Sequence, residues 1–437
     1  MSFPRYPAYK PSGVEWLGEV PEHWSLKPVF GVASERDEDN KGMKEDNLLS
    51  LSYGNIVNKD ITTSDGLLPE SFETYQIVRP GDIVLRLTDL QNDKRSLRSA
   101  LVTQTGIITS AYLTLEPERI DSKFLNYLLR AYDVSKVFYS MGGGLRQSMK
   151  YGDIKRMPLV IPAKAEQLAT ATFLDHETTK IDALIAEQQR LIELLQEKRQ
   201  AVISHAVTKG LNPDAPMKDS GVEWLGEVPE HWEHAKLSNL TTKIGDGLHG
   251  TPEYVEESEF YFINGNNLSA GAIVISDSTR CVCKYALDKH WVDLNDSTLL
   301  MSINGTIGNF ALYRGEPIML GKSASYINCN QRISREYLCW IIQSIGAQRY
   351  FEISSAGTTI SNLGLNSMKR MPVALPPLDE QARINNSLVE FCAESDRLVQ
   401  HAVVAVGLLQ ERRSALISAA VTGQIDVRGL VPEAEAA

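Results

Sequence analysis

The chain has 437 residues, which is enough for two or three domains with substantial cores. With 43% hydrophobic and 23% charged residues, its composition is that of an ordinary globular protein and excludes a disordered chain. A formal net charge of −11 argues against a protein that is basic all over, although a single basic surface stays compatible with it. The sequence lacks a secretory signal and a membrane-spanning apolar run, and its five cysteines are sparse, so we expect a cytoplasmic protein with free thiols.

The chain contains an internal duplication. The thirteen residues SGVEWLGEVPEHW at 12–24 recur unchanged at 220–232. The other matches lie 214 positions apart: KRMP at 155–158 and 369–372, Glu-Gln at 166–167 and 380–381, and LLQEKR at 194–199 with LLQERR at 408–413. We infer two units of about 210 residues each. Between the matches the two copies differ, which is typical of one scaffold that holds two different binding surfaces.

The divergent part of each unit is expected to mix strands and helices. Apolar runs bounded by Gly, Asn and Asp predict strands at 82–87, 272–275 and 298–303. Helical spacing of apolar residues predicts helices at 124–132 and 337–345. A long helix is then expected from near Glu166 to Ala206, and at about 1.5 Å per residue it would span roughly 60 Å. The Asn-Pro-Asp-Ala-Pro segment at 212–216 ends it.

A heptad pattern marks both long helices. In the first copy, alternating steps of three and four select Ile181, Leu184, Leu191, Leu195 and Val202, with Gln188, Lys198 and His205 completing the series. The second copy has Leu388, Phe391, Leu398, Ala402, Ala405, Leu409, Leu416 and Ala419 on the matching stripe. Such stripes need a partner, so we expect the two helices to pack on each other as a coiled coil. If they pair antiparallel, the variable regions would lie at opposite ends of a rod, a spacing that suits DNA half-sites.

No catalytic or metal-binding constellation emerges from the sequence. Gly315–Ser323 resembles a phosphate-binding loop, but five residues separate its glycines where four are needed, and strand-like residues follow. Cys281 and Cys283 lack a second cysteine pair at zinc spacing. The chain also lacks the Asn-Pro-Pro-aromatic motif of an amino-methyltransferase. We therefore expect a non-catalytic polypeptide with no metal or cofactor of its own.

Basic and amide side chains supply the candidate DNA contacts, because Arg pairs with guanine edges and Asn or Gln with adenine edges. Residues 75–156 contain 13 Lys and Arg against 8 Asp and Glu. The candidates in the first unit are Lys94, Arg95, Arg98, Arg146, Gln147, Ser148 and Lys150. Those in the second unit are Lys243, His249, Asn266, Asn304, Lys322, Thr358, Thr359 and Asn362. For each residue taken alone, a solvated surface position or ordinary turn chemistry is the competing interpretation.

Taken together, these motifs resemble the specificity subunit (HsdS) of type I restriction-modification systems over nearly the whole chain. Each unit opens with SGVEWLGEVPEHW and closes its variable region with KRMP, a proline and Glu-Gln before the long helix. Gly245–Pro252 (GDGLHGTP) and Asn304–Gly308 look like recurring motifs of target-recognition domains. The first unit lacks the Asp-Gly-x-His-x-Thr-Pro pattern, so its reading surface cannot be inferred from the second.

The resemblance implies an α+β fold with internal pseudo-two-fold symmetry, in which two long helices pair as an antiparallel coiled coil between two target-recognition domains. The expected divisions are recognition domains at 1–163 and 212–377, helices at 164–211 and 378–425, and a tail at 426–437. Each recognition domain would read one half of a bipartite double-stranded DNA target, and the helices would set the spacer and dock two modification subunits.

Catalysis, by the same resemblance, belongs to the partners. The modification subunits would bind S-adenosylmethionine and methylate adenine, and two restriction subunits would supply ATP- and Mg-dependent translocation and cleavage. Two alternatives stay open: a bivalent adaptor that binds no DNA and assembles through its coiled coil, and the recognition subunit of a simpler methylating nuclease. The acidic charge favours the adaptor slightly, whereas a neighbouring methyltransferase gene would favour DNA recognition.

Overall fold

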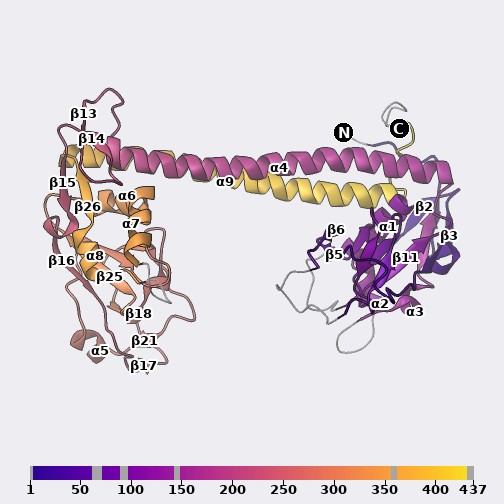
Figure 1. The fold of residues 1–437 in the computed structure, drawn as a ribbon, viewed down its shortest axis with the longest axis horizontal. Helices are drawn as coiled ribbons and strands as arrows, with labels where there is room; N and C mark the ends of the chain where they lie inside the picture. The colour runs from indigo at the N-terminus through magenta and orange to yellow at the C-terminus, as the bar shows by residue number, and fades with distance from the viewer. Residues whose placement is uncertain (1–2, 62–70, 89–96, 142–147, 356–361, 431–437) are drawn as a thin grey trace. The chain divides into compact units, whose positions relative to one another are not determined.

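A computed structural model describes residues 3–61, 71–88, 97–141, 148–355 and 362–430. The chain divides into two compact units, residues 1–188 with 404–437 (unit 1) and residues 189–403 (unit 2). The long helices α4 (Lys164–Lys209) and α9 (Leu378–Val421) join the two units, and each unit contains one variable region and a part of both helices (Figure 1).

Unit 1 is built on a four-stranded antiparallel sheet in the order β4-β11-β8-β9. These strands span Ala33–Glu35, Leu113–Pro117, Ile83–Leu85 and Ser99–Leu101. Helix α1 (Ser122–Val134) packs on the sheet through Phe124, Leu125 and Leu128, and its N-cap Asp121 accepts from the backbone N–H of Phe124. Four strand pairs complete the unit: β1 (Tyr9–Pro11) with β2 (Glu19–Pro21), β3 (Ser25–Pro28) with β12 (Pro158–Ile161), β5 (Leu49–Ser52) with β6 (Asn55–Asn58), and β7 (Gln76–Val78) with β10 (Gly106–Ile108). The short helices are η1 (Val29–Gly31), α2 (Val137–Met141) and α3 (Tyr151–Ile154).

Unit 2 has a central antiparallel sheet in the order β16-β25-β22-β23, spanning Thr241–Asp246, Ala324–Cys329, Thr298–Ser302 and Phe310–Leu312. A second sheet has the order β17-β21-β18-β24, spanning Tyr254–Val255, Cys281–Val282, Tyr261–Ile263 and Ile318–Leu320. The strand pairs are β13 (Met217–Asp219) with β14 (Glu227–Pro229), β15 (Glu233–Lys236) with β26 (Pro372–Leu375), and β19 (Leu268–Ser269) with β20 (Ala272–Ile273). The helices are η2 (Leu237–Asn239), η3 (Gly265–Asn267), α5 (Lys284–Lys289), α6 (Arg335–Gln343), α7 (Ile345–Ser355) and α8 (Leu365–Arg370).

The two variable regions share a central topology that their sequences conceal. In both units the first strand of the sheet pairs with a long strand, which pairs with a buried strand and then an edge strand. The predicted strands at 82–87 and 298–303 are confirmed as β8 and β22. The run at 272–275 is strand only over its first two residues, and Val274 and Ile275 beyond it are 47% and 42% exposed. The predicted helices are confirmed as α1 and α6.

The two long helices pack on each other, but the predicted heptad register is right at only every second position. Ile181 is buried and Leu195 and Val202 are partly buried, whereas Leu184 and Leu191 are 47% and 42% exposed. A stripe of buried or partly buried residues runs along α4 from Ile181: Ile181, Ile185, Gln188, Ile192, Leu195, Arg199, Val202 and Ala206. Near the end of the helix Ile203 and Val207 are also buried, in the core of unit 2. The seam thus runs in steps of four and three from Ile181, where three and four were predicted.

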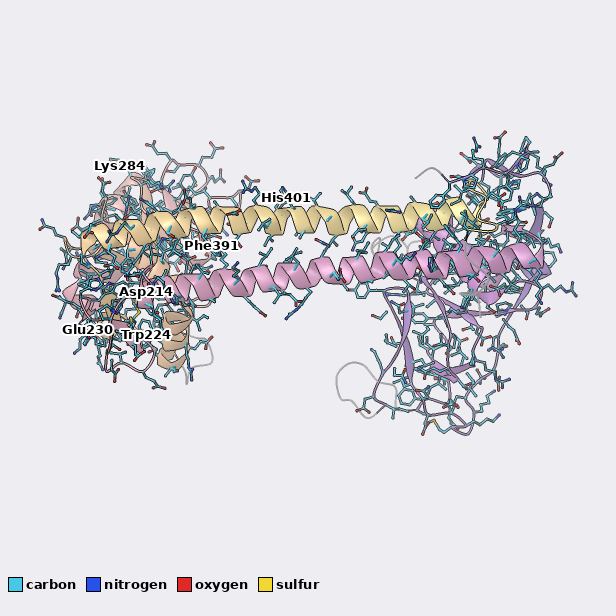
Figure 2. The ribbon with its side chains drawn as sticks, turned by 90° about the horizontal axis from the view of Figure 1, so that it is seen from above. Asp214, Trp224, Glu230, Lys284, Phe391 and His401 are labelled. Atoms are coloured by element: carbon cyan, nitrogen blue, oxygen red, sulfur yellow. The ribbon has the colours of Figure 1, made fainter. Side chains whose placement is uncertain are left out.

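Helix α9 repeats this one-residue offset. A matching stripe of buried or partly buried residues runs along α9: Leu388, Cys392, Ser395, Val399, Ala402, Val406, Leu409, Arg413, Leu416 and Ala420. Each lies 214 positions after a buried or partly buried residue of α4. Of the predicted positions outside this stripe, Leu398 is 45% exposed, whereas Phe391, Ala405 and Ala419 are partly buried beside it. Figure 2 shows Phe391 on the side of α9 that faces α4 and His401 on the opposite side.

Equivalent ion pairs join α4 and α9 in the two units. In unit 1, Arg413 Nε and Nη2 donate to the two carboxylate oxygens of Asp182 at 2.8 and 3.2 Å. In unit 2, Arg199 Nε lies 3.7 Å from Asp396 Oδ1. The two arginines and the two aspartates are each 214 positions apart, so the duplicated helices pair in the same antiparallel way in both units. Because leucine and isoleucine occur side by side at 184–185 and 191–192, apolar character does not distinguish the two registers.

The repeated thirteen residues hold the ends of the long helices through a tryptophan. Trp24 in unit 1 and Trp232 in unit 2 are both 0% exposed. Gly423, just beyond the end of α9, has φ +76°, and a Cβ there would lie 2.3 Å from Pro21 and 3.1 Å from Trp24. Gly210, just beyond the end of α4, has φ +75°, and a Cβ there would lie 3.2 Å from Trp232. In each unit the tryptophan therefore closes on a left-handed glycine that ends one long helix.

The same repeat, together with the Glu-Gln pair, holds the start of the other helix. His23 Nε2 lies 3.0 Å from Glu166 Oε2 in the first turn of α4, and His231 Nε2 lies 2.8 Å from Glu380 Oε2 in the first turn of α9. Gln167 accepts from the N–H of Asp121, the N-cap of α1, and Gln381 accepts from the N–H of Ser334, the N-cap of α6.

In each unit these contacts form a junction between the repeated segment and the ends of the two long helices. We call it the clamp, and it comprises His23, Trp24, Glu166, Gln167 and Gly423 in unit 1, with His231, Trp232, Glu380, Gln381 and Gly210 in unit 2. The histidine, tryptophan, glutamate and glutamine of the clamp recur in both copies of the sequence, but the sequence does not show their contacts. Within the described residues, no helix is both long enough and apolar enough to cross a membrane.

The corrected seam predicts a difference between neighbouring positions of α4. Ile181→Ala removes a side chain that is 3% exposed in the core of unit 1, and it should cost about 2–5 kcal/mol of unfolding free energy. Leu184→Ala, the matched control, removes a side chain that is 47% exposed and should stay within about 0.5 kcal/mol of the unsubstituted chain. Urea titration followed by circular dichroism measures both, and equal losses would contradict the register.

Candidate functional site

An equivalent loop contact occurs at the same end of the central sheet in both units. In unit 1 the N–H of Met149 donates to the carbonyl of Leu87 at 2.9 Å, and in unit 2 the N–H of Leu363 donates to the carbonyl of Ile303 at 2.9 Å. Leu87 and Ile303 follow the buried strands β8 and β22, while Met149 and Leu363 precede the short helices α3 and α8. Each unit therefore brings together the loop after its buried strand and the segment before its last short helix.

In unit 2 three further loops converge on this contact through backbone hydrogen bonds. The N–H of Leu248 donates to the carbonyl of Leu320 at 2.7 Å, and the N–H of Gly321 donates to that of Ile263 at 2.8 Å. The N–H of Ile303 donates to the carbonyl of Ser323 at 3.0 Å. The loops gathered in this way carry five of the candidates named from the sequence: His249, Asn266, Asn304, Lys322 and Asn362. We call this group the loop cluster.

The side chains of the loop cluster are available to a ligand. His249, Asn266, Lys322 and Asn362 are exposed, and Asn304 is half-buried. His249 Nε2 lies 2.8 Å from Asp246 Oδ2, which orients the imidazole. Lys243, by contrast, lies on β16 with its Nζ 5.8 Å from the centre of the Tyr326 ring, so it flanks the cluster from the sheet.

Three glycines allow the backbones of these loops to approach closely. A Cβ at Gly247 would lie 2.0 Å from the carbonyl oxygen of Leu320, one at Gly265 would lie 2.2 Å from Ser302 Oγ, and one at Gly321 would lie 2.3 Å from Asn264 Oδ1. Ser323 Oγ donates to Asn264 Oδ1 at 3.0 Å and accepts from the N–H of Gly265 at 2.9 Å. The loops are thus held by backbone packing and by the half-buried hydroxyl of Ser323, so their polar side chains lie on a rigid support.

Of the three described candidates in unit 1, two are exposed and one, Arg98, is buried. Ser148 and Lys150 are exposed and flank Met149, at the position equivalent to the loop cluster. Six candidates from both units lie outside the described residues: Lys94, Arg95, Arg146, Gln147, Thr358 and Thr359.

Arg98 does not present its side chain to a ligand, contrary to the expectation from sequence. It is 0% exposed, its Nη1 donates to the carbonyls of Arg86 and Thr88 at 3.1 and 2.8 Å, and its Nε donates to the Tyr139 hydroxyl at 3.2 Å. Its guanidinium thus supports the chain on either side of residues 89–96 from within. The basic cluster in the sequence gave no signal of this, because the oxygens that accept from Arg98 belong to distant residues.

A second buried cation, Arg130, was missed by sequence reasoning. It is 8% exposed, and its Nη2 donates to the carbonyls of Gly54 and Ser99 at 2.5 and 2.7 Å. Burial lowers the pKa of its guanidinium, and Arg413 adds to that effect through charge repulsion. Arg130 therefore links the β5–β6 hairpin to the central sheet.

The segment that resembles a phosphate-binding loop in sequence is made of strand and turn. Gly315–Ser323 contains strand β24 and leads into strand β25, so no helix N-terminus follows it to hold a phosphate. In the part of the chain that the structure describes, no group of three or more His, Cys, Asp and Glu side chains could hold a metal ion.

Comparison with known proteins identifies the family. Residues 229–400 match the type I restriction modification DNA specificity domain. The StySPI specificity subunit of Salmonella potsdam is 24% identical, covering 93% of this chain and 90% of that protein. The EcoKI specificity subunit of Escherichia coli K12 is 22% identical, with the same two coverages of 93% and 90%. The chain belongs to the family of type I specificity subunits. As a member of this family, the specificity subunit is a non-catalytic component of a restriction-modification complex.

Solved structures agree with the fold of this specificity subunit. The HsdS subunit from Thermoanaerobacter tengcongensis superimposes with a TM-score of 0.50 at 14% identity, covering 93% of this chain and 98% of that one. A chain from a study of complex assembly and conformational transition of the type I R-M system gives a TM-score of 0.68 at 15% identity, covering 92% and 98%. At such identities the likeness concerns the fold alone.

Two glycines of one motif should differ in their tolerance of substitution. Gly247→Ala places a methyl group against the carbonyl of Leu320 and should destabilise unit 2 by about 1–3 kcal/mol, since the backbone must shift. Gly250→Ala, three residues along the same loop, meets no heavy atom within 4 Å and should leave the stability unchanged. Thermal unfolding of both variants tests the loop packing, and a stable Gly247→Ala variant would show that the close approach is wrong.

Proposed function

We propose that this specificity subunit recognises a bipartite double-stranded DNA target, with the recognition domains at 1–163 and 212–377 each reading one half. The observation that carries the proposal is the equivalent loop contact in the two units, Met149 to Leu87 and Leu363 to Ile303. Duplicated scaffolds with equivalent but chemically different loops suit two half-sites of different sequence. Membership of the family indicates that the ligand is DNA. The loops at these contacts are the proposed DNA-binding surface.

The side chains of the loop cluster have the chemistry for base recognition. An asparagine amide can both donate to and accept from adenine, and a lysine can donate to guanine or to a phosphate. Asn266, Asn304 and Asn362 are thus assigned to base edges, with Lys322 and His249 at base edges or the backbone. Lys243 on the neighbouring strand is assigned to a phosphate, which would set the register of unit 2 on the duplex.

In unit 1, Ser148 and Lys150 are assigned to the equivalent contacts. Lys94, Arg95, Arg146 and Gln147, and in unit 2 Thr358 and Thr359, remain proposed DNA contacts on their sequence alone. Arg98 is omitted, because it is 0% exposed and its Nη1 and Nε donate to carbonyls and to the Tyr139 hydroxyl inside the unit.

We further propose that the long helices set the spacing of the half-sites and dock two modification subunits. Outside the seam, leucines that are 214 positions apart are exposed: Leu184 and Leu398 at 47% and 45%, and Leu194 and Leu408 at 45% and 61%. Unit 1 contains Leu184 and Leu408, and unit 2 contains Leu194 and Leu398, so each unit exposes one such leucine from each helix. Exposed leucines at equivalent positions support one docking surface per unit for two copies of the same partner.

The chemistry of the system then lies in the partners. The modification subunits would bind S-adenosylmethionine and methylate adenine in both half-sites, and the restriction subunits would use ATP and Mg. The specificity subunit would select the DNA site for both reactions. Its place of action would be the cytoplasm, where the DNA to be modified lies.

Exchange of one reading surface tests the half-site assignment. Replacing residues 25–150 by those of another family member should change one half of the methylated sequence and leave the other half unaltered. The reciprocal exchange of residues 233–364 should change only the other half. Sequencing of methylated adenines in host DNA measures both exchanges, and a change in both halves after a single exchange would refute the two-reader assignment.

Charge introduced at the exposed leucines tests the docking surface. Leu194→Asp with Leu398→Asp should reduce the number of bound modification subunits from two to one, since only the surface of unit 2 is altered. Gln189→Asp with Gln400→Asp adds the same charge at exposed polar positions of the same two helices and should leave both bound. Native mass spectrometry counts the subunits, and thermal unfolding checks that stability stays within about 0.5 kcal/mol. Two bound subunits on the leucine variant would place docking elsewhere.

A further inference from the structure

We propose that the β5–β6 hairpin of unit 1 enters the major groove of the DNA and that Tyr53 at its tip contacts base edges of the first half-site. The proposal rests on the proposed function, because it names a specificity-determining residue for the same recognition. Figure 1 shows the hairpin at the margin of unit 1.

The conformation of Tyr53 is the first reason. Tyr53 and Gly54 form the two-residue turn between β5 and β6, with φ values of +45° and +78°. Such a turn, with positive φ at both positions, is typically made by Asn-Gly or Asp-Gly, because a bulky side chain is disfavoured at positive φ. A tyrosine therefore occupies a position where asparagine would serve the fold better.

The exposure of Tyr53 is the second reason. Its residue surface is 76% exposed, so packing does not offset the unfavourable backbone conformation. A disfavoured conformation that the fold does not need points to a role in binding.

The hairpin that carries Tyr53 packs on the central sheet of unit 1. Leu49 and Leu51 on β5 are 2% and 6% exposed and belong to an apolar cluster with the central sheet. The buried guanidinium of Arg130 donates to the carbonyl of Gly54, directly after Tyr53. The turn is thus anchored on its inner side, whereas the tyrosine ring is exposed.

A series of contacts connects the turn to the candidate reading surface of unit 1. A Cβ at Gly54 would lie 2.8 Å from Cβ of Leu97, the residue before Arg98. Arg98 donates to the carbonyl of Thr88, and Leu87 accepts from Met149 at the loop contact. A continuous chain of contacts therefore joins the turn to the segment that bears Ser148 and Lys150.

The chemistry of the hairpin suits base edges better than phosphates. A two-stranded ribbon fits the width of the major groove. Beyond Tyr53 the ribbon bears Asn55 and Asn58, both exposed, and the amide of Asn58 is hydrogen-bonded to Gln104 and Asn47. These side chains are uncharged. A tyrosine ring can contact a thymine methyl group, and its hydroxyl can donate to or accept from a base edge.

The decisive variant is Tyr53→Asn, which creates the preferred Asn-Gly turn and so should keep or raise the melting temperature. In complex with its modification subunits, this variant should bind the target duplex about 5- to 150-fold more weakly than the unsubstituted chain, the range of one base contact. Discrimination should be lost at one or two adjacent base pairs of the first half-site only. Tyr285→Asn, which removes an equally exposed tyrosine (74%) from unit 2, is the matched control and should leave the first half-site unaffected.

The target duplex is the sequence found by mapping methylated adenines, and the first half-site is the one that changes when residues 25–150 are exchanged. Binding is measured for duplexes in which each base pair of that half-site is replaced in turn. Unchanged affinity and discrimination for Tyr53→Asn would overturn the inference, as would an equal loss on all duplexes or a failure to bind the modification subunits. If the unsubstituted complex itself does not discriminate between duplexes, the proposed function fails instead.

Discussion

The clamp at the helix ends is the contact on which the rest of the structure depends. In each unit a buried tryptophan closes on a glycine at the end of one long helix, while a histidine and a glutamine hold the start of the other. Because the two helices come from different copies of the duplication, neither copy supplies a complete clamp. Unit 1 needs Gly423 from the end of the chain, and unit 2 needs Gly210 from its middle.

The clamp explains which parts of the chain are free to diverge. Gln167 and Gln381 tie the long helices to the N-caps of α1 and α6, and these helices pack on the central sheets. The described candidate DNA contacts, such as Ser148 in unit 1 and Lys322 in unit 2, are not part of the clamp. Reading loops can therefore change while the scaffold, and with it the position of each sheet on the helices, is retained.

Sequence alone predicted the duplication, the long helices, α1, α6 and two of the three strands, because periodicity and exact repeats survive without tertiary information. It misplaced the helix seam by one residue at alternate positions, since Leu184 and Ile185 are equally apolar and the residues of the partner helix, such as Arg413 beside Asp182, are remote in sequence. It assigned Arg98 to the surface, since burial of a cation depends on carbonyls that only the fold brings near. The convergence of His249, Asn304 and Lys322 likewise depends on backbone hydrogen bonds that no motif records.

The leucines exposed at equivalent positions of α4 and α9 have a consequence for how the protein persists in a cell. Leu184, Leu194, Leu398 and Leu408 present apolar surface to water whenever no partner covers it, which favours self-association and capture by quality control. Subunits made in excess of their partners would be removed faster than assembled ones. The supply of partner would then determine how much specificity subunit accumulates, whatever the rate of its synthesis.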